Sequence, residues 1–403
     1  MKIKVGVIFG GESVEHEVSI ISAVQAMYKM DTEKYEIIPI YITKDREWYT
    51  GDTLKDIETF QDMSLVKRYA KNVVLYYKKG EFVLQSKGFF KRVVASIDLA
   101  FPIVHGTNVE DGVLQGYLQS IGIPFVGSDI YASVVGQDKV FMKQIFADSS
   151  LPITKYEWFY DTEYLEDNDK VLKKIMTNLV FPVIIKPATL GSSIGIHPAK
   201  DRSELVSAIE DAISYDTKIV VEEMVPNLTE VNISVLGNYS QASLSEIEEV
   251  ITKEDFLTYE DKYVGGSKTK GGKYSGSKGM ASASRLIPAS ISPKLKEEVR
   301  EIALQANRAL GTSGVSRIDF LVDNKKENVY INEVNSIPGS LSFYLWEPIK
   351  KDYTELLDDM INIAIRDYKK RITKTHSFSN NILSGFGTGS KGLKGLKGSK
   401  GKL

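Results

Sequence analysis

The sequence predicts an α/β protein whose N-terminal region is built on a parallel sheet. The run KIKVGVIF has the pattern of a buried strand that ends at Gly10 and Gly11, and the residues after it have helical spacing. YEIIPIYIT then has the pattern of a second strand, so the chain opens with a β-α-β unit. Farther on, the alternating runs SRIDFLV and VYINEVN flank the polar segment DNKKEN, which predicts an antiparallel hairpin.

Further elements are predicted between these two regions. Residues 46–91 are polar and rich in tyrosine, and we expect them to elaborate the first domain. SIDLAFPIVHG predicts a strand, and TNVEDGVLQGYLQSIGIPFVG predicts a loop, a helix and a return strand. DKVFMKQIFADS predicts an amphipathic helix that begins near Lys139. Three more strands are expected at NLVFPVIIKP, KIVVEEMV and LTEVNISVLG.

The predicted hairpin places polar side chains together on one face. With its turn centred near Lys326, three cross-strand pairs share this face: Arg317 with Asn335, Asp319 with Glu333, and Leu321 with Ile331. The opposite face is apolar: Ile318, Phe320, Val322, Tyr330 and Val334. Two carboxylates directly across a ladder repel each other, so a cation between them would explain the arrangement. Carboxylate and amide oxygens are ligands that Mg²⁺ takes. The alternative is a solvated face with one Arg–Asp pair.

Composition limits the class of protein. A chain of 403 residues, 42% hydrophobic and 26% charged, is long enough for two or three globular domains. A formal net charge of −2 gives no reason to expect nucleic acid or a membrane as partner. The absence of cysteine excludes disulfides and thiolate sites, and fits a reducing cytoplasm. No apolar run approaches the roughly eighteen residues of a membrane span, so a cytoplasmic protein is expected.

The turn after the first strand does not favour a dinucleotide. The third glycine of the GxGxxG pattern is missing, and Glu12 and Glu15 stand where a pyrophosphate would meet the helix. An acidic residue at this position suits an amine better. His105, at the end of a later predicted strand, is either a ligand, an acid–base group or a hydrogen-bonding residue that positions its neighbours, and the last is the commoner role.

The segment NLVFPVIIKPATLGSSIGI predicts an anion site. Its strand ends at Lys186 and opens into the loop Gly191-Ser192-Ser193, which Gly195 closes. Glycines let backbone N–H groups approach an anion, serines add hydroxyl donors, and the lysine adds positive charge. The alternative is a plain hairpin turn with an exposed lysine. Together with the acids of KIVVEEMV, Glu230 and the hairpin face, the segment predicts a site for a nucleotide with Mg²⁺.

These motifs occur in an order that resembles a known family. The opening GGESVEHEVS, the HG, EDG and QG run, the DK pair, FPVIIKPATLGSSIGI, YEDKY, RIDF and NEVNSIPG are similar to the D-alanine–D-alanine ligases of the ATP-grasp superfamily, over about residues 3 to 370. The resemblance implies an N-terminal domain at 1–127, a central ATP-grasp subdomain at 128–222, a C-terminal subdomain at 223–373 and a tail at 374–403. It also implies that ATP phosphorylates one D-alanine and that the amine of a second attacks the acylphosphate, for peptidoglycan synthesis.

The resemblance also implies roles for individual residues. Those implied to bind ATP are Lys139, Lys186, Ser192, Ser193, Glu222, Glu223, Val225, Glu230 and Lys262. Those implied to hold two Mg²⁺ ions, with Mn²⁺ as a substitute, are Asp319, Glu333 and Asn335. Those implied to act on the reacting groups are Glu15 at the first ammonium, Ser192 and Tyr263 in a closing contact, and Arg317 with the Gly339 N–H at the oxyanion.

The sequence departs from the family pattern in two places. Leu257 stands where many members have an aromatic residue, so the site is expected to close differently. After Gly339 the family has a serine–leucine pair that binds the carboxylate of the second substrate, whereas this chain reads SLSFYLWEP. Tyr344 takes the place of that serine, and Ser342 lies two residues earlier, so the second substrate is the less certain one. A dipeptide or amino-acid ligase with another acceptor, and a non-catalytic nucleotide-binding relative, are the alternatives.

Gly/Ser/Lys-rich segments are found in the loop 264–284 and in the tail 377–403. The GSK triplets at 266–268 and 276–278 recur at 389–391 and 398–400, and such sequence cannot pack a core. The interpretations are plain disorder, weak attraction to an anionic partner, or use of the lysine amines or terminal carboxylate as a ligase substrate. The family resemblance further implies a homodimer formed through the N-terminal domain.

Overall fold

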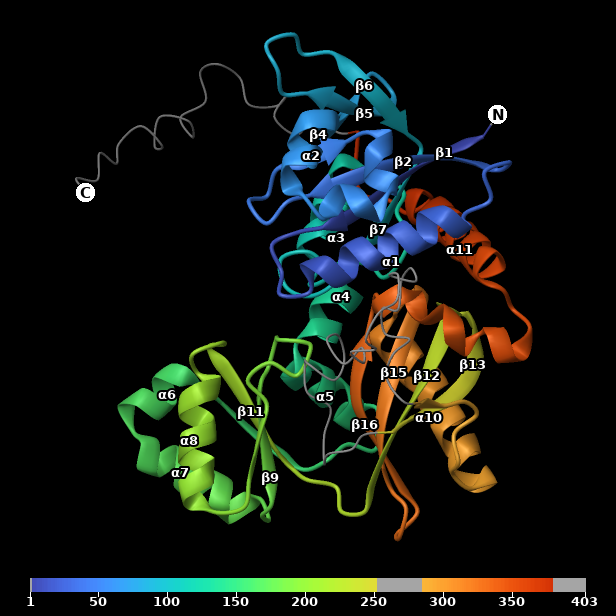
Figure 1. Ribbon diagram of the computed structural model, residues 1–403. Helices are drawn as coiled ribbons and strands as arrows, with labels where there is room; N and C mark the ends of the chain where they lie inside the picture. The colour runs from blue at the N-terminus through green and yellow to red at the C-terminus, as the bar shows by residue number, and fades with distance from the viewer. Residues whose placement is uncertain (1, 252–284, 380–403) are drawn as a thin grey trace, which may run out of the picture. The chain divides into compact units, whose positions relative to one another are not determined.

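The computed structural model describes residues 2–251 and 285–379. The chain divides into two units, residues 1–365 and residues 366–403. The first unit contains three β-sheets with helices packed against them (Figure 1). The predicted domain boundaries at 127/128, 222/223 and 373/374 stay predictions.

The first sheet has seven strands in the order β6-β5-β4-β3-β2-β1-β7. Its strands are β1 (Ile3–Gly10), β2 (Tyr35–Ile42), β3 (Trp48–Thr50), β4 (Lys71–Lys78), β5 (Glu81–Ser86), β6 (Val93–Ile97) and β7 (Leu99–Ile103). Its helical segments are α1 (His16–Lys29), η1 (Asp52–Lys55), η2 (Ile57–Phe60), α2 (Met63–Tyr69) and α3 (Val113–Ile121). Strand β1 pairs in parallel with β2 and β7, which confirms the predicted β-α-β unit. The other strands add antiparallel, and the predicted return strand is a single bridge at Phe125.

The second sheet has the antiparallel order β10-β9-β11-β8. Its strands are β8 (Tyr156–Tyr160), β9 (Val183–Pro187), β10 (His197–Ala199) and β11 (Lys218–Glu223). The helices in this part of the chain are α4 (Ile130–Gln137), α5 (Lys139–Asp148), α6 (Asp161–Glu166), α7 (Asn168–Asn178) and α8 (Arg202–Ala212). Apolar side chains of α7 and α8, such as Leu172 and Ile209, pack on the sheet in one buried cluster. Helix α5 begins at Lys139, as predicted.

The third sheet has the order β14-β13-β12-β15-β16. Its strands are β12 (Leu228–Asn238), β13 (Gln241–Val250), β14 (Arg285–Leu286), β15 (Gly314–Asp323) and β16 (Asn328–Asn335). Helix α10 (Pro293–Leu310) and helix α5 pack on one face through Val299, Ile302 and Phe146, beside Ile318 and Phe320 of β15. The other face of β15 and β16 is thereby left for polar side chains.

The predicted hairpin is present, but its register was only partly correct. Arg317 pairs with Asn335 and Asp319 with Glu333, as predicted, and a β-bulge follows. Beyond the bulge Phe320 pairs with Ile331 and Leu321 with Tyr330, so the predicted Leu321–Ile331 pair was wrong. The extra residue is Asn332. Because of it, Ile331 is buried in the core and Tyr330 is not, the reverse of the predicted arrangement.

The β1–α1 turn requires glycine at its first position. Gly10 has a φ of 88°, and a Cβ on it would lie 2.2 Å from the carbonyl oxygen of Ile42. This backbone conformation and contact exclude other residues. The tight turn places Glu15 as the residue before helix α1.

The segment after β16 packs against the first sheet. It contains η4 (Gly339–Leu345), η5 (Glu347–Ile349) and α11 (Tyr353–Ile372). Leu341, Leu345, Trp346 and Leu356 lie in the same buried cluster as the core of the first sheet. Helix α11 extends from the first unit into the second. No helix in residues 2–251 and 285–379 is both long and apolar enough to span a membrane.

Candidate active site

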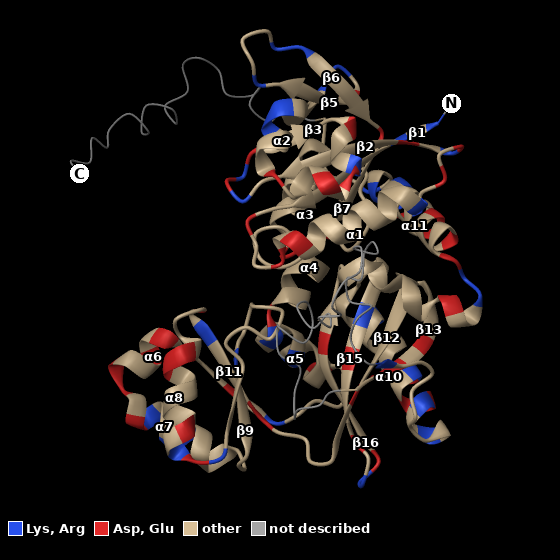
Figure 2. Cartoon of the chain, viewed as in Figure 1, with Lys and Arg blue, Asp and Glu red and all other residues tan. Residues whose placement is uncertain are grey.

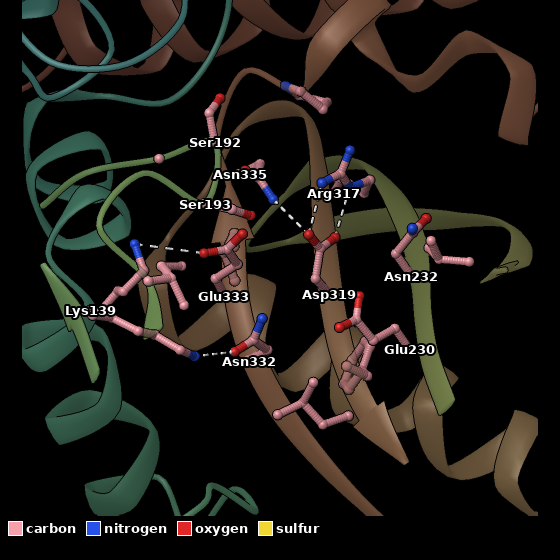
Figure 3. Close-up of a pocket in the computed structure, with 18 of the residues that line it drawn as sticks. Lys139, Ser192, Ser193, Glu230, Asn232, Arg317, Asp319, Asn332, Glu333 and Asn335 are labelled. Atoms are coloured by element: carbon pink, nitrogen blue, oxygen red, sulfur yellow. Dashed lines mark hydrogen bonds and ion pairs between the residues drawn. The ribbon is translucent and has the colours of Figure 1, made fainter. Parts of the chain in front are cut away.

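One pocket in the first unit is lined by strands of the second and third sheets and by segments that flank the first sheet, among them α1 and the loop after β7. It is lined by α1 and its preceding turn, α5, the loop after β9, the end of β11, strands β12, β13, β15 and β16, and the segment after β16. Figure 3 shows Arg317, Asp319, Glu333 and Asn335 projecting from the hairpin into this pocket. The polar face of β15 and β16 therefore faces a cavity rather than open solvent.

Arg317 and Asp319 form a two-point ion pair on β15. The Arg317 Nε and Nη2 each donate to one Asp319 oxygen at 2.7 Å, and Asn335 Nδ2 donates to Asp319 Oδ2 at 3.2 Å (Figure 3). On the ribbon of β15, basic and acidic positions follow each other closely (Figure 2). Burial opposes the charge of Arg317, but the Asp319 carboxylate outweighs it and raises the pKa of the guanidinium. The arginine is therefore a fixed cation beside the acidic groups.

Two lysines approach the second strand of the hairpin. Lys139 Nζ lies 3.7 Å from Glu333 Oε2 and donates to the Leu190 carbonyl oxygen at 2.7 Å. Lys186 Nζ donates to Asn332 Oδ1 at 3.0 Å, so the bulge residue also enters the pocket (Figure 3). The lysines come from α5 and β9, and they therefore link the second and third sheets across the pocket.

A buried ionic cluster lies beneath these lysines. Glu222 lies 2.9 Å from Lys143 Nζ and 3.3 Å from Lys186 Nζ, and accepts from Thr154 Oγ1 at 2.7 Å. Burial alone would raise the pKa of Glu222, but the two lysines lower it to about 2, so this carboxyl is ionised. Burial lowers the pKa of Lys143, and Glu222 balances its charge, so the net positive charge of the cluster is that of Lys186.

The loop after β9 closes one end of the pocket. Ser192 Oγ donates to Glu15 Oε1, which joins this loop to the start of α1. Ser192 and Ser193 have φ values of 56° and 60°, a region that residues other than glycine rarely adopt. A Cβ on Gly191 would lie 3.1 Å from Glu15 Oε2, so the loop approaches Glu15 closely. Backbone strain of this kind is typical of functional loops.

His105 and Glu110 hold the segment that follows β16. His105 Nδ1 donates to the Ile337 carbonyl oxygen at 2.8 Å, and its Nε2 lies 3.0 Å from Ser22 Oγ. Burial lowers the pKa of His105, so the ring is neutral and positions its neighbours, as predicted. Glu110 accepts from the Ile337 N–H at 2.8 Å and from the Ser336 hydroxyl at 3.0 Å. Burial raises the pKa of Glu110 to about 7.

Comparison with known proteins identifies the family. The model described as D-ala D-ala ligase N-terminus matches residues 4–128, and that described as D-ala D-ala ligase C-terminus matches residues 145–362. The chain belongs to the D-alanine–D-alanine ligase family. The D-alanine–D-alanine ligase of Thermosipho melanesiensis is 38% identical over 381 residues, which cover 94% of this chain and 98% of that protein.

Solved structures of this ligase family have the same fold. The VanG D-Ala:D-Ser ligase of Enterococcus faecalis is 30% identical, with a TM-score of 0.74 over 90% of this chain and 100% of that chain. The D-alanine–D-alanine ligase of Coxiella burnetii is 26% identical, with a TM-score of 0.77 over 92% of this chain and 96% of that chain. The predicted ATP-grasp fold is thereby confirmed.

Every site residue predicted from the sequence and lying in the described ranges lines this pocket. They are Glu15, Lys139, Lys186, Ser192, Ser193, Glu222, Glu223, Val225, Glu230, Arg317, Asp319, Glu333, Asn335 and Gly339. Lys262 and Tyr263 lie outside the described residues. The carboxylate of Glu222 turns toward lysines, and that of Glu223 accepts from the Val180 N–H at 3.0 Å.

Sequence reasoning missed several residues of the ligase pocket. Asn332 was missed because a β-bulge turns its side chain into the site. The alternation of polar and apolar residues in the sequence does not reveal this bulge. Lys143 does not line the pocket but lies behind it, paired with Glu222; it stands four residues after Lys139 on one helix, and this spacing could have revealed it. Glu248 and Arg285, on β13 and β14, carry no local motif, and only the fold brings them to the pocket.

Proposed function

We propose that this chain is an ATP-dependent ligase that joins two D-alanine molecules into D-alanyl-D-alanine for peptidoglycan synthesis. One observation carries the proposal: a single pocket gathers the paired carboxylates of the hairpin, Lys139 and Lys186, and the Glu15–Ser192 contact. The curated relatives named D-alanine–D-alanine ligase match nearly their whole length, which supports the same reaction. The substrates are small molecules, in keeping with a pocket lined by charged and polar side chains.

The charge distribution supports ATP at the lysine side of the pocket. Lys139 and Lys186 contact the phosphates and supply the positive charge that stabilises them. Ser192 and Ser193 close over the phosphates through hydroxyl and backbone donors. The backbone from Glu222 to Val225 meets adenine, and Glu230 binds the ribose. These are the residues that the sequence singled out.

The donor set on the hairpin fits Mg²⁺. Asp319 and Glu333 are opposed across the ladder, and Asn335 brings an amide group beside them, with its Nδ2 donating to Asp319. No cluster of three or more His, Asp or Glu side chains suited to a metal occurs among the described residues, so the amide completes the proposed ligand set. Hard oxygen ligands that leave positions for phosphate oxygens are what Mg²⁺ takes, and Mn²⁺ is an acceptable substitute. Two bound ions would neutralise the charge that develops on the transferred phosphoryl group.

The protein's own groups orient the two steps of the reaction. Glu15 holds the ammonium of the first D-alanine. The carboxylate of this D-alanine attacks the γ-phosphorus of ATP, which forms the acylphosphate and releases ADP. The amine of the second D-alanine then attacks the acylphosphate carbonyl, and phosphate leaves. Arg317, kept charged by Asp319, and the Gly339 N–H stabilise the oxyanion that forms at that carbonyl.

Closure of the pocket protects the acylphosphate from water. The contact between Ser192 and Glu15 already joins the loop after β9 to the N-terminal turn. We propose that Tyr263 adds to this contact and that Lys262 reaches the phosphates. Excluding water matters because an exposed acylphosphate would hydrolyse before the second amine attacks.

The cellular setting of the proposed reaction follows from its substrates. ATP and the cell-wall precursor pathway place the enzyme in the cytoplasm, in line with the lack of cysteine. A homodimer through the N-terminal domain and a weak anionic partner for the lysine-rich tail stay predictions.

An assay of phosphate release from ATP, with D- and L-amino acids offered singly and in pairs, tests the proposed function. Turnover with D-alanine alone, and mass-spectrometric detection of D-alanyl-D-alanine, are expected. Turnover only with a mixed pair of amino acids would show that the enzyme is a ligase with an acceptor other than D-alanine. No turnover with any amino acid would overturn it in favour of a non-catalytic nucleotide-binding protein.

A further inference from the structure

The second D-alanine brings its own carboxylate into the pocket. The residue roles in the proposed function give this carboxylate no binding partner. The ATP phosphates and the first substrate account for Lys139, Lys186 and Arg317. Among the described lysines and arginines that line the pocket, Arg285 remains. The nearest serine of SLSFYLWEP that could serve, Ser342, is fully buried and does not line the pocket, whereas Tyr344 does.

Arg285 is held by two neighbours at this side of the pocket. It begins β14 and pairs with Val250 of β13. Its guanidinium carbon lies 4.2 Å from the centre of the Tyr344 ring, and its Nε lies 3.1 Å from Glu248 Oε1. The Tyr344 hydroxyl donates to the other Glu248 oxygen at 3.3 Å. The guanidinium is thus stacked on the Tyr344 ring and ion-paired with Glu248, and these two contacts restrict its orientation.

The hydrogen-bonding capacity of Arg285 is not used up. Its Nε and Nη1 are buried and have no hydrogen-bond partner among the described residues. The Nε is within ion-pair distance of Glu248, but its N–H is not aligned for a hydrogen bond. An arginine offers five N–H donors, and leaving buried donors unpaired costs free energy. A buried guanidinium with unpaired donors indicates a missing acceptor, and a carboxylate is the acceptor whose geometry it matches.

The position of Arg285 also suits the reaction. Tyr344 and Glu248, which hold Arg285, both interact electrostatically with Arg317, the proposed oxyanion residue. Burial raises the pKa of Tyr344 to about 12, so its hydroxyl stays protonated and does not repel an incoming carboxylate. An amino acid whose carboxylate lies at Arg285 therefore has its amine on the side of the pocket where the carbonyl is attacked.

We propose that Arg285 binds the carboxylate of the second amino acid, and that Tyr344 and Glu248 position its guanidinium for this. This inference rests on the proposed function and names a residue of the acceptor site. It assigns to a guanidinium the role that a serine has in the family pattern. The expected specificity is for acceptors with a free carboxylate next to the amine.

The test measures acceptor binding separately from the first half-reaction. In the full chain with Arg285→Gln, the KM for the second D-alanine should rise on the order of ten- to a hundredfold, because a charge-assisted contact is lost. The preference for D-alanine over D-alaninamide as acceptor should fall by a similar factor. Trapping the acylphosphate with hydroxylamine, which needs no acceptor site, should give D-alanine hydroxamate at the wild-type rate.

Two further variants make the result decisive. Arg300→Gln is the control. Arg300 does not line the pocket, and its Nη2 lies 3.2 Å from Glu246, which is on β13 like Glu248. This variant should behave as wild type. Arg285→Lys keeps the charge and should retain part of the preference for D-alanine over its amide. An unchanged second KM in Arg285→Gln, or an equal loss of hydroxamate and dipeptide, would overturn the assignment. If the wild-type chain forms neither product, the proposed function itself has failed.

Discussion

At the scale of single residues, Asp319 shows how closely charge is balanced in the pocket. Both of its oxygens accept from Arg317, and one also accepts from Asn335, yet its side chain remains 19% exposed. A carboxylate held in this way keeps lone pairs for a metal ion while its orientation is fixed. Glu333, opposite on β16, is held by Lys139 in a looser contact.

Asp319→Asn and Glu333→Gln should each lower the turnover of dipeptide formation by roughly two to three orders of magnitude, because the groups that stabilise the phosphoryl charge are lost. Steady-state kinetics with ATP and Mg²⁺ measure the effect. Glu327→Gln is the matched control, because Glu327 lies at the exposed end of the same hairpin, 3.2 Å from Lys294. Near-normal rates in either test variant would refute the metal assignment.

Lys186 is expected to act on ATP rather than on D-alanine. Lys186→Met removes one of the two ammonium groups beside Glu222, and the KM for ATP should rise on the order of tenfold or more. The KM for D-alanine should change much less. Lys174→Met, at a surface pair with Glu157, serves as the control. A selective effect on D-alanine would contradict the phosphate role.

Glu110 should make stability depend on pH. Its folded-state pKa of about 7 lies above its ordinary value of 4.5, so between these values the folded state binds the extra proton. Its contribution to stability is therefore complete below pH 4.5 and is lost as the pH rises toward 7. The unfolding free energy of wild type minus that of Glu110→Gln should fall by up to about 3 kcal/mol across this window. Chemical denaturation at several pH values measures it, and a flat difference would refute the assignment.

At the scale of elements, the hairpin shows what alternation can and cannot predict. The pairs Arg317–Asn335 and Asp319–Glu333 follow from the period of two, and the structure has both. Between Glu333 and the turn the predicted register was wrong. An extra residue in one strand hardly changes the hydrophobic pattern of so short a run, so the sequence does not reveal it. The bulge turns Asn332 toward Lys186, so the failure of the simple pattern falls at the site itself.

The strand and helix predictions in the middle of the chain succeeded for a different reason. Buried strands such as β9 and β11 are short apolar runs that end at a lysine or an acid, and this contrast is visible in the sequence. The contact of Arg285 with Tyr344 joins residues that are far apart in the chain, and no local pattern encodes it. Sequence therefore predicted the nucleotide end of the pocket better than the acceptor end.

The segment η4 stores backbone strain beside the reacting groups. Ser340, Leu341 and Ser342 have φ values of 51°, 52° and 49°, in the left-handed region. Each costs about 1–2 kcal/mol for a residue other than glycine, so packing and hydrogen bonds must offset it. The Ser340 N–H donates to Ser22 Oγ at 2.9 Å, and Leu341 is buried. This turn carries both Gly339 and Tyr344, which line the pocket.

The β1–α1 turn should tolerate no side chain at Gly10. Gly10→Ala would place a Cβ 2.2 Å from a backbone oxygen at a positive φ, and we expect a loss of about 3 kcal/mol or more in unfolding free energy. Gly80→Ala also has a positive φ but has nothing within 4 Å of the added Cβ, so it should lose only about 1–2 kcal/mol. Equal losses in the two variants would show that the close approach at Gly10 has no energetic weight.

At the scale of the whole described molecule, each of the three sheets has a buried cluster, and the cluster of the first sheet also contains Leu236 and Val315 of the third. The cores of the three sheets hold Val7, Ile233 and Ile185 respectively, whereas the polar side chains near their edges meet in the site. Lys139, Lys186 and Glu15 line this pocket from separate elements, so a ligand in it would contact several parts of the chain at once. Catalysis by positioning suits such an arrangement.

The measurement that tests the account most directly follows the oxygen of the first carboxylate. With D-alanine labelled with ¹⁸O in its carboxyl group, phosphate released during dipeptide formation should carry one labelled oxygen per turnover, because that oxygen bridges carbon and phosphorus in the acylphosphate. Mass spectrometry of the phosphate and the dipeptide measures both products at once. Unlabelled phosphate released together with D-alanyl-D-alanine would contradict the acylphosphate route and the roles assigned to this pocket.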